Sequence, residues 1–437
     1  MTIEYVKKAK KTASSDASDV SELVQGILND IETGGEEACL RYREKFDKYD
    51  GSVVLTAEEI EAACARVPEK LKQDIAFAHA NVKKFAEVQK STIVDTEVEI
   101  IPGLIAGQKA IPCNTAGCYA PGGRYAHIAS ALMTVTTAKV AGCQNIVACS
   151  PPRPDGGIHP AIVYTAHLCG ADKILALGGV QGIAAMAFGL FGVPKADILV
   201  GPGNQFVAEA KRILFGRVGI DMFAGPTDSL ILADASADPE LVAADLVGQA
   251  EHGYNSPVWL VTDNHALAMR VMDLVPQYIA TLPELNRDNA TKAWDDYAEV
   301  IVCADREEMA AVSDRYAPEH LTVQAEDLDW WLQRLRCYGS LFLGNETTVA
   351  FGDKASGPNH VLPTSGAAKY TGGLSVHKYM KLVTWQRSNA EAMKEVALAT
   401  ARISRLEGME AHARSADIRL AKYFPEETFD LSGQGHA

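Results

Sequence analysis

The sequence contains no run of about 18 apolar residues, which excludes a membrane-spanning helix of ordinary length. Its first 19 residues carry four lysines, but no apolar segment of signal-peptide length follows them. The nine cysteines include no CxxC pair, so the sequence predicts neither a disulfide framework nor a thiolate zinc site. These absences predict a cytoplasmic protein without a membrane partner.

Positive charge is also scarce. Lys and Arg total 41 against 56 Asp and Glu, which gives a formal net charge of −15. A field of this sign repels nucleic acid and anionic surfaces, so we expect a small-molecule substrate and no nucleic-acid partner. An anionic substrate needs local cations in its site that overcome this background.

The composition that is present, 47% apolar and 22% charged residues, is that of a folded, soluble protein. A chain of 437 residues is long enough for two or more cores. From about residue 100, short apolar runs bounded by Gly or Pro alternate with helical segments, as in "KILALGG" and "ADILVGPGN". This order predicts an α/β fold with two Rossmann-like parallel sheets.

The placement of these runs also predicts the domains. Helical periodicity dominates residues 19–95 and returns over the last 60 residues. We expect, in order, an N-terminal arm (1–24), a discontinuous Rossmann-like domain (25–118 and 230–375), a second Rossmann-like domain (119–229) and a C-terminal helical tail (376–437).

The segment "GQAEHG" ends a predicted helix that begins with Asp238 as N-cap and Pro239 at the first helical position. Gln249 and His252 are three positions apart and share a helical face, where two donor atoms can converge on a metal ion. The macrodipole also favours a histidine near a helix C-terminus, and the segment alone favours that simpler interpretation.

Two further segments carry candidate catalytic groups. In "YAPEHLTV", Glu319 stands beside His320, a pair that can act as acid and base, although Glu–His pairs are also common on surfaces. The loop "FGDKASGPNHVLPT" carries Asp353, Asn359 and His360 without the periodicity of a packed element. A functional and a structural interpretation of this loop are equally open.

Glycines follow two predicted strands, in "ALGGVQG" and "LVGPGNQF", where amides at a helix N-terminus can hold a pyrophosphate. Neither segment matches G-x-G-x-x-G, and tight strand-to-helix turns use glycine in any case. These loops alone indicate a dinucleotide site only weakly.

Eight ordered blocks resemble the histidinol dehydrogenase family over about residues 20–423. They are "CYAPGGRY", "GGVQGIAAMAFG", "VGPGNQFVAEAKR", "GIDMFAGPTDSLILAD", "GQAEHG", "APEHLTV", "GDKASGPNHVLPT" and "EGMEAHARSADIRL". The resemblance implies a zinc- and NAD-dependent dehydrogenase that oxidises a primary alcohol to a carboxylate through a bound aldehyde, consuming two NAD. It reverses the interpretation of "GQAEHG" from a helix end to a metal site.

By matching motif positions, the resemblance implies a zinc site and an acid/base pair. His320 is expected to accept the hydroxyl proton, and Glu319 to help activate water for addition to the aldehyde. Nitrogen and oxygen donors suit zinc, which lowers the pKa of the substrate oxygen. The implied zinc ligands are Gln249, His252, Asp353 and His412, the last contributed by the partner subunit of a domain-swapped homodimer.

The same matching places the cofactor and the substrate. Tyr119, Gln181 and Asn204 match NAD-contacting positions, each in a glycine-containing loop. The matching substrate-contacting positions are Thr227, His360 and Glu407, of which Glu407 is expected to reach across the dimer.

Departures from the family pattern indicate the substrate. Where the family commonly reads PGG-T-A-A-Y-P-S, this chain has "PGGRYAHIAS", which introduces Arg124 and His127. Near an acidic position of the pattern GLSV-x-D-F, it has His377 and Lys378. These changes toward positive charge favour a small anionic polyol.

Several segments, among them "SPPRPDGG" and "YTGGLSVHKYMKLVTWQ", resemble one subgroup of the family, the sulfopropanediol dehydrogenases. That subgroup converts (R)-2,3-dihydroxypropane-1-sulfonate to (R)-sulfolactate. A sulfonate stays ionised and has three acceptor oxygens, so we expect Arg124, His127 and Lys378 to bind it. These cations can alternatively pair with carboxylates of an acidic protein.

Two other functions stay open on the sequence. The retained Glu407 suits the ammonium group of L-histidinol, which favours a biosynthetic histidinol dehydrogenase. A non-catalytic NAD- or zinc-binding regulator on the same fold is the other, and the intact Glu319, His320 and ligand positions argue against it.

Overall fold

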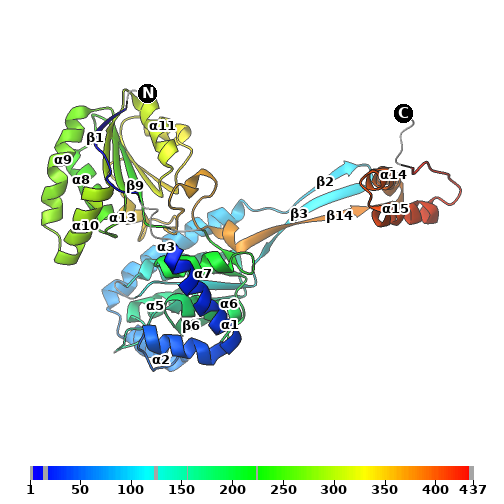
Figure 1. Cartoon of the computed structure of the whole chain (residues 1–437), viewed down its shortest axis with the longest axis horizontal. Coiled ribbons are helices and arrows are strands. Elements are labelled where there is room, and N and C mark those ends of the chain that lie inside the picture. The colour runs from blue at the N-terminus through cyan, green and yellow to red at the C-terminus, as the bar shows by residue number, and fades with distance from the viewer. Residues whose placement is uncertain (1–2, 13–17, 123–125, 155, 223–224, 433–437) are drawn as a thin grey trace. The chain divides into compact units, whose positions relative to one another are not determined.

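The computed structural model describes residues 3–12, 18–122, 126–154, 156–222 and 225–432. Its elements form two compact units (Figure 1). The larger unit comprises Met1–Lys90 and Pro112–Tyr379, and the smaller unit comprises Ser91–Ile111 and Met380–Ala437. In the described residues, every helix is too short or too polar to cross a bilayer.

The larger unit contains a five-stranded parallel sheet in the order β6-β5-β4-β7-β8. Parallel neighbours need crossover connections, which the helices α4 to α7 supply between successive strands. The strands are β4 (Thr115–Tyr119), β5 (Asn145–Ser150), β6 (Lys173–Ala176), β7 (Ile198–Val200) and β8 (Gly219–Ile220). The crossover helices are α4 (Ile128–Ala141), α5 (Pro160–Cys169), α6 (Gly179–Phe188) and α7 (Gln205–Leu214).

The N-terminal helices α1 (Ser18–Phe46), α2 (Ala57–Ala65) and α3 (Glu69–Ser91) belong to the same unit. Val24, Ile27, Leu28 and Ile31 of α1 are buried in one core with α6 and α7, beside the five-stranded sheet. Burial of this apolar stripe is what fixes α1 to the layer.

The larger unit also contains a six-stranded sheet in the order β1-β11-β10-β9-β12-β13. All pairs are parallel except β1 with β11 at the edge. The strands are β1 (Glu4–Lys7), β9 (Ser229–Ala233), β10 (Val258–Thr262), β11 (Glu299–Val302), β12 (His320–Gln324) and β13 (Ser340–Leu343). The predicted α/β fold with two parallel sheets is therefore confirmed, whereas the edge strand β1 was not predicted.

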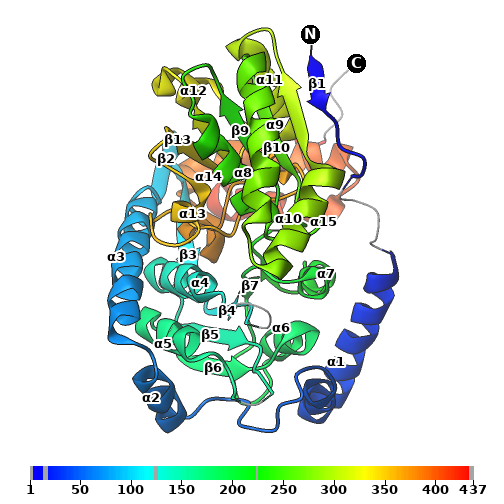
Figure 2. The same ribbon diagram turned by 90° about the vertical axis from the view of Figure 1, so that its left-hand side faces the viewer.

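Helices cover both faces of the six-stranded sheet (Figures 1 and 2). One core joins the sheet to α8 (Pro239–Ala250), α9 (His265–Ala280) and α10 (Glu284–Tyr297). A second core joins the opposite face to α11 (Arg306–Tyr316) and α12 (Leu328–Arg334). The short α13 (Val349–Gly352) and the 3-10 turns η1 (Ala367–Lys369) and η2 (Val376–Tyr379) complete the unit.

The two sheets use separate parts of the chain. All strands of the five-stranded sheet come from residues 115–220, and those of the six-stranded sheet, apart from β1, come from residues 229–343. The more detailed domain boundaries expected from the sequence stay a prediction.

The smaller unit consists of a three-stranded sheet in the order β14-β3-β2 and two helices. Its elements are β2 (Thr96–Ile101), β3 (Leu104–Pro112), β14 (Met380–Ser388), α14 (Ala390–Leu406) and α15 (Glu410–Tyr423). The helical tail expected from the sequence is present from Ala390 onward, but Met380–Ser388 form a strand. Pairing of β14 with β3, where the ring of Trp385 lies over Gly107, overrides the helical pattern.

Candidate active site

The candidate catalytic residues lie where the six-stranded sheet begins rather than where it ends. His320 is the first residue of β12 and pairs with Ser229 and Ser340, the first residues of β9 and β13. Glu319 immediately precedes it, and Thr227 stands two positions before β9. The strand register therefore gathers these side chains at the amino edge of the sheet.

Asp353, the residue that follows α13, lies between two histidines. Its Oδ1 is 3.5 Å from His320 Nε2, and its Oδ2 is 3.9 Å from His252 Nε2. Burial works to raise the pKa of Asp353, but contact with His320 and the nearby imidazoles of His360 and His252 outweighs it and lowers the pKa to about 2. Asp353 is therefore a fixed anion at the centre of the site.

Glu319 and His320 form a buried pair with its own proton chemistry. His320 Nδ1 lies 3.8 Å from Glu319 Oε2, and both residues are less than one tenth exposed. Burial raises the pKa of Glu319 to about 8, against the lowering effect of His320. Burial works to lower the pKa of His320, but Glu319, Asp353 and Asp228 outweigh it and raise the pKa. The pair can hold or release a proton near neutral pH.

Asp228 holds this pair in place, and the sequence analysis missed it. Its Oδ1 accepts a hydrogen bond from Glu319 N at 2.7 Å, and its Oδ2 accepts one from Ser365 N at 2.9 Å. The backbone of Asp228 accepts a bond from His320 N at 3.2 Å. This buried aspartate thus links the amino-terminal ends of β9 and β12 to the loop after Thr364. Its position next to Thr227 was the available signal.

Gln249 lies in the last turn of α8, as predicted, whereas His252 lies in the turn just beyond the helix, which ends at Ala250. Gln249 is 5% exposed, and its Oε1 has no hydrogen-bond partner among the described residues. His252 exposes 38% of its side chain, and desolvation, opposed by Asp353, lowers its pKa. A neutral imidazole and an amide oxygen without a hydrogen-bond partner are both suitable metal donors.

The side chains of Gln249, His252 and Asp353 are of the types that bind a divalent cation. Within the described residues, no group of three His, Cys, Asp or Glu side chains could hold a metal by itself. The set therefore needs the amide oxygen of Gln249 and a further donor. An orphaned buried amide oxygen is what a missing ligand contact leaves behind.

His360 connects this site to the other sheet. Its Nδ1 lies 2.9 Å from the carbonyl oxygen of Asp353, which can only accept, so Nδ1 carries the proton. Its Nε2 lies 3.1 Å from Ser130 Oγ in α4 and accepts from that hydroxyl. Burial lowers the pKa of His360, and burial together with His360 and Lys354 lowers the pKa of His127 to about 4. Both rings are neutral at physiological pH.

The expected NAD residues lie at the carboxyl edge of the five-stranded sheet. Tyr119 ends β4, and its hydroxyl accepts a hydrogen bond from Gly179 N at 3.0 Å. Gln181 lies in the first turn of α6, and its Nε2 donates to Asp47 Oδ2 at 3.0 Å. Asp47 Oδ2 also accepts from Gly178 N at 3.0 Å. Asp47 was not among the predicted residues, although it sets the orientation of Gln181.

Asn204 caps α7, because its Oδ1 accepts from Phe206 N and Val207 N, each at 3.1 Å. The loop before it is fixed by a fully buried ion pair between Lys211 and Asp221. Lys211 Nζ also donates to the carbonyl of Gly201 at 2.8 Å, and Asp221 Oδ2 accepts from Gly201 N at 2.7 Å. Gly201 itself has φ +114° and lies against the backbone of Tyr119. A side chain at this position would collide with that backbone.

Comparison with known proteins decides the family. The sequence model described as "Histidinol dehydrogenase" matches residues 10–420. The chain belongs to the histidinol dehydrogenase family. It is 74% identical over the full length of both chains to the sulfopropanediol 3-dehydrogenase of Ruegeria pomeroyi. It is also 40% identical to the histidinol dehydrogenase of Methanosarcina barkeri, with 93% of each chain covered. The protein is thus a dehydrogenase of this family.

A crystal structure of histidinol dehydrogenase from Elizabethkingia anophelis matches this member of the family with a TM-score of 0.89. The two sequences are 36% identical, and 95% of each chain is covered. The α/β architecture expected from the resemblance is therefore the architecture of the family.

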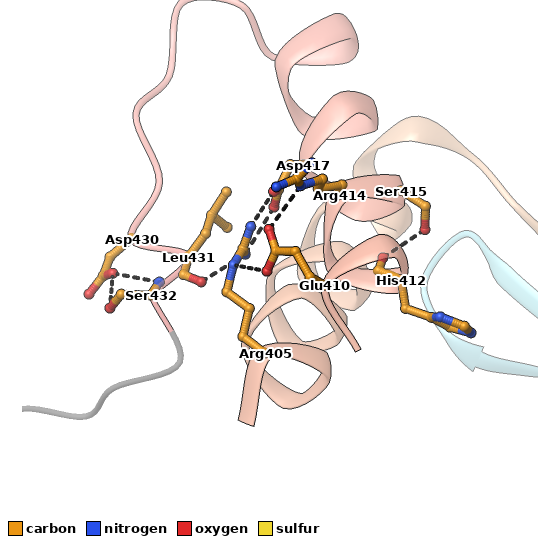
Figure 3. A network of polar contacts seen from close by, with 9 residues as sticks. All are labelled: Arg405, Glu410, His412, Arg414, Ser415, Asp417, Asp430, Leu431 and Ser432. Atoms are coloured by element: carbon orange, nitrogen blue, oxygen red, sulfur yellow. Dashed lines mark hydrogen bonds and ion pairs between the residues drawn. The ribbon is translucent and has the colours of Figure 1, made fainter. Parts of the chain in front are cut away.

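In this histidinol dehydrogenase family member, the two site residues predicted near the C-terminus belong to the smaller unit. Glu407 caps the end of α14, and His412 lies in the first turn of α15. Both are exposed, and neither side chain has a hydrogen bond or ion pair with another described residue. The imidazole of His412 points away from the polar network beside it, and its carbonyl accepts from Ser415 Oγ at 2.8 Å (Figure 3).

That network fixes α15 to α14. Arg405 forms an ion pair with Asp417 and contacts Glu410 Oε2 at 3.4 Å (Figure 3). Arg405 Nη1 also donates to the carbonyl of Leu431 at 2.8 Å. A small core of Ala397, Ala401, Ala416, Leu420 and Phe424 lies between the helices. His412 therefore lies on a helix, α15, that packing and ion pairs fix to α14.

The three residues expected to bind a sulfonate differ in where the structure places them. Arg124 lies outside the described residues. His127 stands at the N-terminus of α4 and is electrostatically coupled to His360 and His252. Lys378 lies in η2, where its Nζ donates to Thr371 Oγ1 at 2.8 Å.

Proposed function

We propose that this protein catalyses the zinc-dependent, NAD-linked oxidation of (R)-2,3-dihydroxypropane-1-sulfonate to (R)-sulfolactate through a bound aldehyde. The observation that carries this proposal is the 74% identity, over both full lengths, with a sulfopropanediol 3-dehydrogenase. The cluster of Glu319, His320 and Asp353 supports the chemistry.

Four side chains of the dimer are proposed to hold the zinc ion: Gln249, His252, Asp353 and the partner subunit's His412. The low pKa of Asp353 and the lowered pKa of His252 keep an anion and a neutral imidazole ready as ligands. When bound, zinc would polarise the substrate alcohol and lower the pKa of its hydroxyl group.

Proton transfer in both oxidations is assigned to Glu319 and His320. In the first, His320 takes the hydroxyl proton while hydride leaves the carbinol carbon for NAD; no described residue hydrogen bonds to either ring nitrogen of His320. In the second, Glu319 takes a proton from the water that adds to the aldehyde, and hydride goes to a second NAD. One alcohol, one water and two NAD yield one carboxylate, two NADH and three protons.

NAD is proposed to contact Tyr119, Gln181 and Asn204. Tyr119 and Gln181 are both linked to the loop at Gly178 and Gly179. The hydroxyl of Tyr119 accepts from Gly179 N, and Gln181 shares the carboxylate oxygen of Asp47 with Gly178 N. The substrate is proposed to contact Thr227 and His360, together with Arg124, His127 and Lys378 at its sulfonate and Glu407 from the partner.

A domain-swapped homodimer is proposed because the smaller unit leaves much apolar surface exposed. Its large exposed side chains include Val98 (58%), Leu382 (59%), Leu406 (81%) and Ile418 (67%). Apolar surface gathered on one small unit is typical of an interface with another chain. A partner that covers it can receive the unpaired Glu407 and His412.

A substrate panel tests the proposal. We expect the zinc-loaded enzyme to form two NADH per molecule of (R)-2,3-dihydroxypropane-1-sulfonate and to oxidise L-histidinol at least 100-fold less efficiently. Rapid oxidation of L-histidinol with none of the sulfonate would instead establish histidinol dehydrogenase activity, as in the relative from Methanosarcina barkeri. Binding of zinc and NAD without turnover of any polyol would favour the non-catalytic regulator.

A further inference from the structure

Lys354 follows Asp353 directly, and hydrogen bonds hold the backbone on both sides of it. Its amide donates to the carbonyl of Phe351 at 3.2 Å. The carbonyl of the next residue, Ala355, accepts from Asn81 Nδ2 of α3 at 2.9 Å. The side chain of Lys354 is exposed, so its ammonium group is accessible from solvent.

The charge of Lys354 reaches three histidines that come from separate segments. They are His127 at the start of α4, His252 after α8, and His360 in the loop beyond α13. After burial, the positive charge of Lys354 is among the causes that lower the pKa of each ring. A charge acts on three rings from separate segments only when it lies within the reach of a screened charge of each. The ammonium group is therefore near one proposed zinc ligand, His252, and two proposed substrate contacts, His127 and His360.

The ammonium group of Lys354 has no counter-ion of its own. Within the part of the chain that the structure describes, no hydrogen bond or ion pair involves its Nζ, although acidic residues outnumber basic ones by 56 to 41. Lys378, in contrast, already donates to Thr371 Oγ1. Burial lowers the pKa of the neighbouring His127 to about 4, so this ring supplies hydrogen bonds but no charge.

We propose that Lys354 binds the sulfonate group of the substrate and so selects anionic over cationic alcohols. The inference rests on the proposed function and names a specificity residue for it. The reacting alcohol and the sulfonate are at opposite ends of a three-carbon chain, so the sulfonate must lie close to the residues that hold the alcohol end. Lys354 is covalently next to Asp353, which meets this requirement.

The chemistry of the two groups is complementary. A sulfonate is ionised at every physiological pH and offers three acceptor oxygens, and an ammonium group offers three donors and a full charge. The same charge repels the ammonium group of a substrate such as L-histidinol. Selectivity then comes from attraction of one substrate and repulsion of the other.

The test compares Lys354→Met, Lys354→Gln and Lys354→Arg with the wild-type zinc-loaded enzyme. Lys369→Met is a matched control, because Lys369 is an exposed lysine of the same unit outside the site. Steady-state kinetics are measured with (R)-2,3-dihydroxypropane-1-sulfonate, glycerol and L-histidinol, together with the KM for NAD and the zinc content.

Loss of the charge in the Met and Gln variants should raise the KM for the sulfonate by about 10- to 100-fold, the loss expected for a charge-assisted hydrogen bond. The kcat, the KM for NAD and the zinc content should stay within about threefold of wild type, and Lys354→Arg should keep most of the affinity. The kcat/KM for glycerol should not fall, and that for L-histidinol should rise. Added salt should lower kcat/KM for the sulfonate in the wild type more steeply than in Lys354→Met.

Two results overturn the inference in different ways. An unchanged KM for the sulfonate in Lys354→Met, or an equal loss with glycerol, would show that Lys354 does not bind the sulfonate while leaving the proposed function intact. A wild-type enzyme that does not oxidise the sulfonate at all would overturn the proposed function, and this assignment with it.

Discussion

His320 Nε2 lies 3.5 Å from Asp353 Oδ1, and the same imidazole lies 3.8 Å from Glu319 through its other nitrogen. One buried ring therefore joins the anion expected to hold a metal to the carboxyl group expected to activate water. Asp353 lowers the cost of charging His320, while burial keeps Glu319 able to carry a proton. The arrangement suits an enzyme that must accept protons in each of two successive oxidations.

Replacing Glu319 should separate the two oxidations. In Glu319→Gln, the first hydride transfer should stay close to wild type, while the second should slow by about 10²- to 10⁴-fold, the range for loss of a general base. Rapid mixing should show a burst of one NADH per site followed by a slow phase. Glu326→Gln, at an exposed glutamate beyond the other end of β12, should behave as wild type. A steady formation of two NADH in Glu319→Gln would contradict the role.

The raised pKa of Glu319 predicts how the stability of the metal-free protein depends on pH. The folded state holds a proton on Glu319 up to about pH 8, whereas the unfolded chain releases it near its ordinary value of 4.5. Between these values the folded state binds more protons, so this residue's contribution to stability falls as pH rises. Urea unfolding at a series of pH values should show this decline in wild type and a flatter profile in Glu319→Gln. Parallel profiles would contradict the prediction.

Asp47 should control NAD binding through Gln181. In Asp47→Asn, the two N–H groups that now share the charged Oδ2 must bond to a weaker, neutral amide oxygen instead. The KM for NAD should rise several-fold with little change in kcat, and the free energy of unfolding should fall by about 1 kcal/mol. Asp50→Asn, at an exposed neighbour, is the control. Equal effects on kcat and on the KM for the alcohol would show a general structural defect instead.

The buried pair of Lys211 and Asp221 should be costly to break from one side. Lys211→Met leaves the carboxylate of Asp221 buried without its cation and should lower the free energy of unfolding by about 3 to 5 kcal/mol. The double variant Lys211→Met/Asp221→Leu should lose less than the sum of the two single variants, which chemical denaturation can measure. Strict additivity would mean that the two charges do not interact.

The sequence predicts the parts of this protein that are local. The alternation of apolar runs and helices indicates both parallel sheets, and the capping signals place Gln249 correctly in the last turn of α8, with His252 just beyond it. Local patterns fail where pairing partners decide the structure. Residues 380–388 form a strand because β3 is available beside them, and the hairpin of β2 and β3 was not foreseen.

The missed site residues depend on contacts between distant positions. Asp47 reaches Gly178 over 131 positions, and Asp228 reaches Glu319 over 91. Neither contact can be read from the local sequence, since a single aspartate is ordinary in any surface helix or turn, and the only signal for Asp228 was its position next to Thr227. Lys354 lies within the motif "GDKASGPNHVLPT", but its proposed role depends on three histidines that only the fold brings near it.

If the partner subunit's His412 is the fourth zinc ligand, two inactive variants should restore each other's activity in a mixed dimer. His252→Ala and His412→Ala should each lack zinc and activity as homodimers, because three remaining donors rarely hold the ion. When the two are unfolded together and reassembled with zinc, half of the dimers should be mixed, and each mixed dimer should contain one intact site. About a quarter of the wild-type activity should therefore be recovered. No recovery from properly assembled mixed dimers would contradict it.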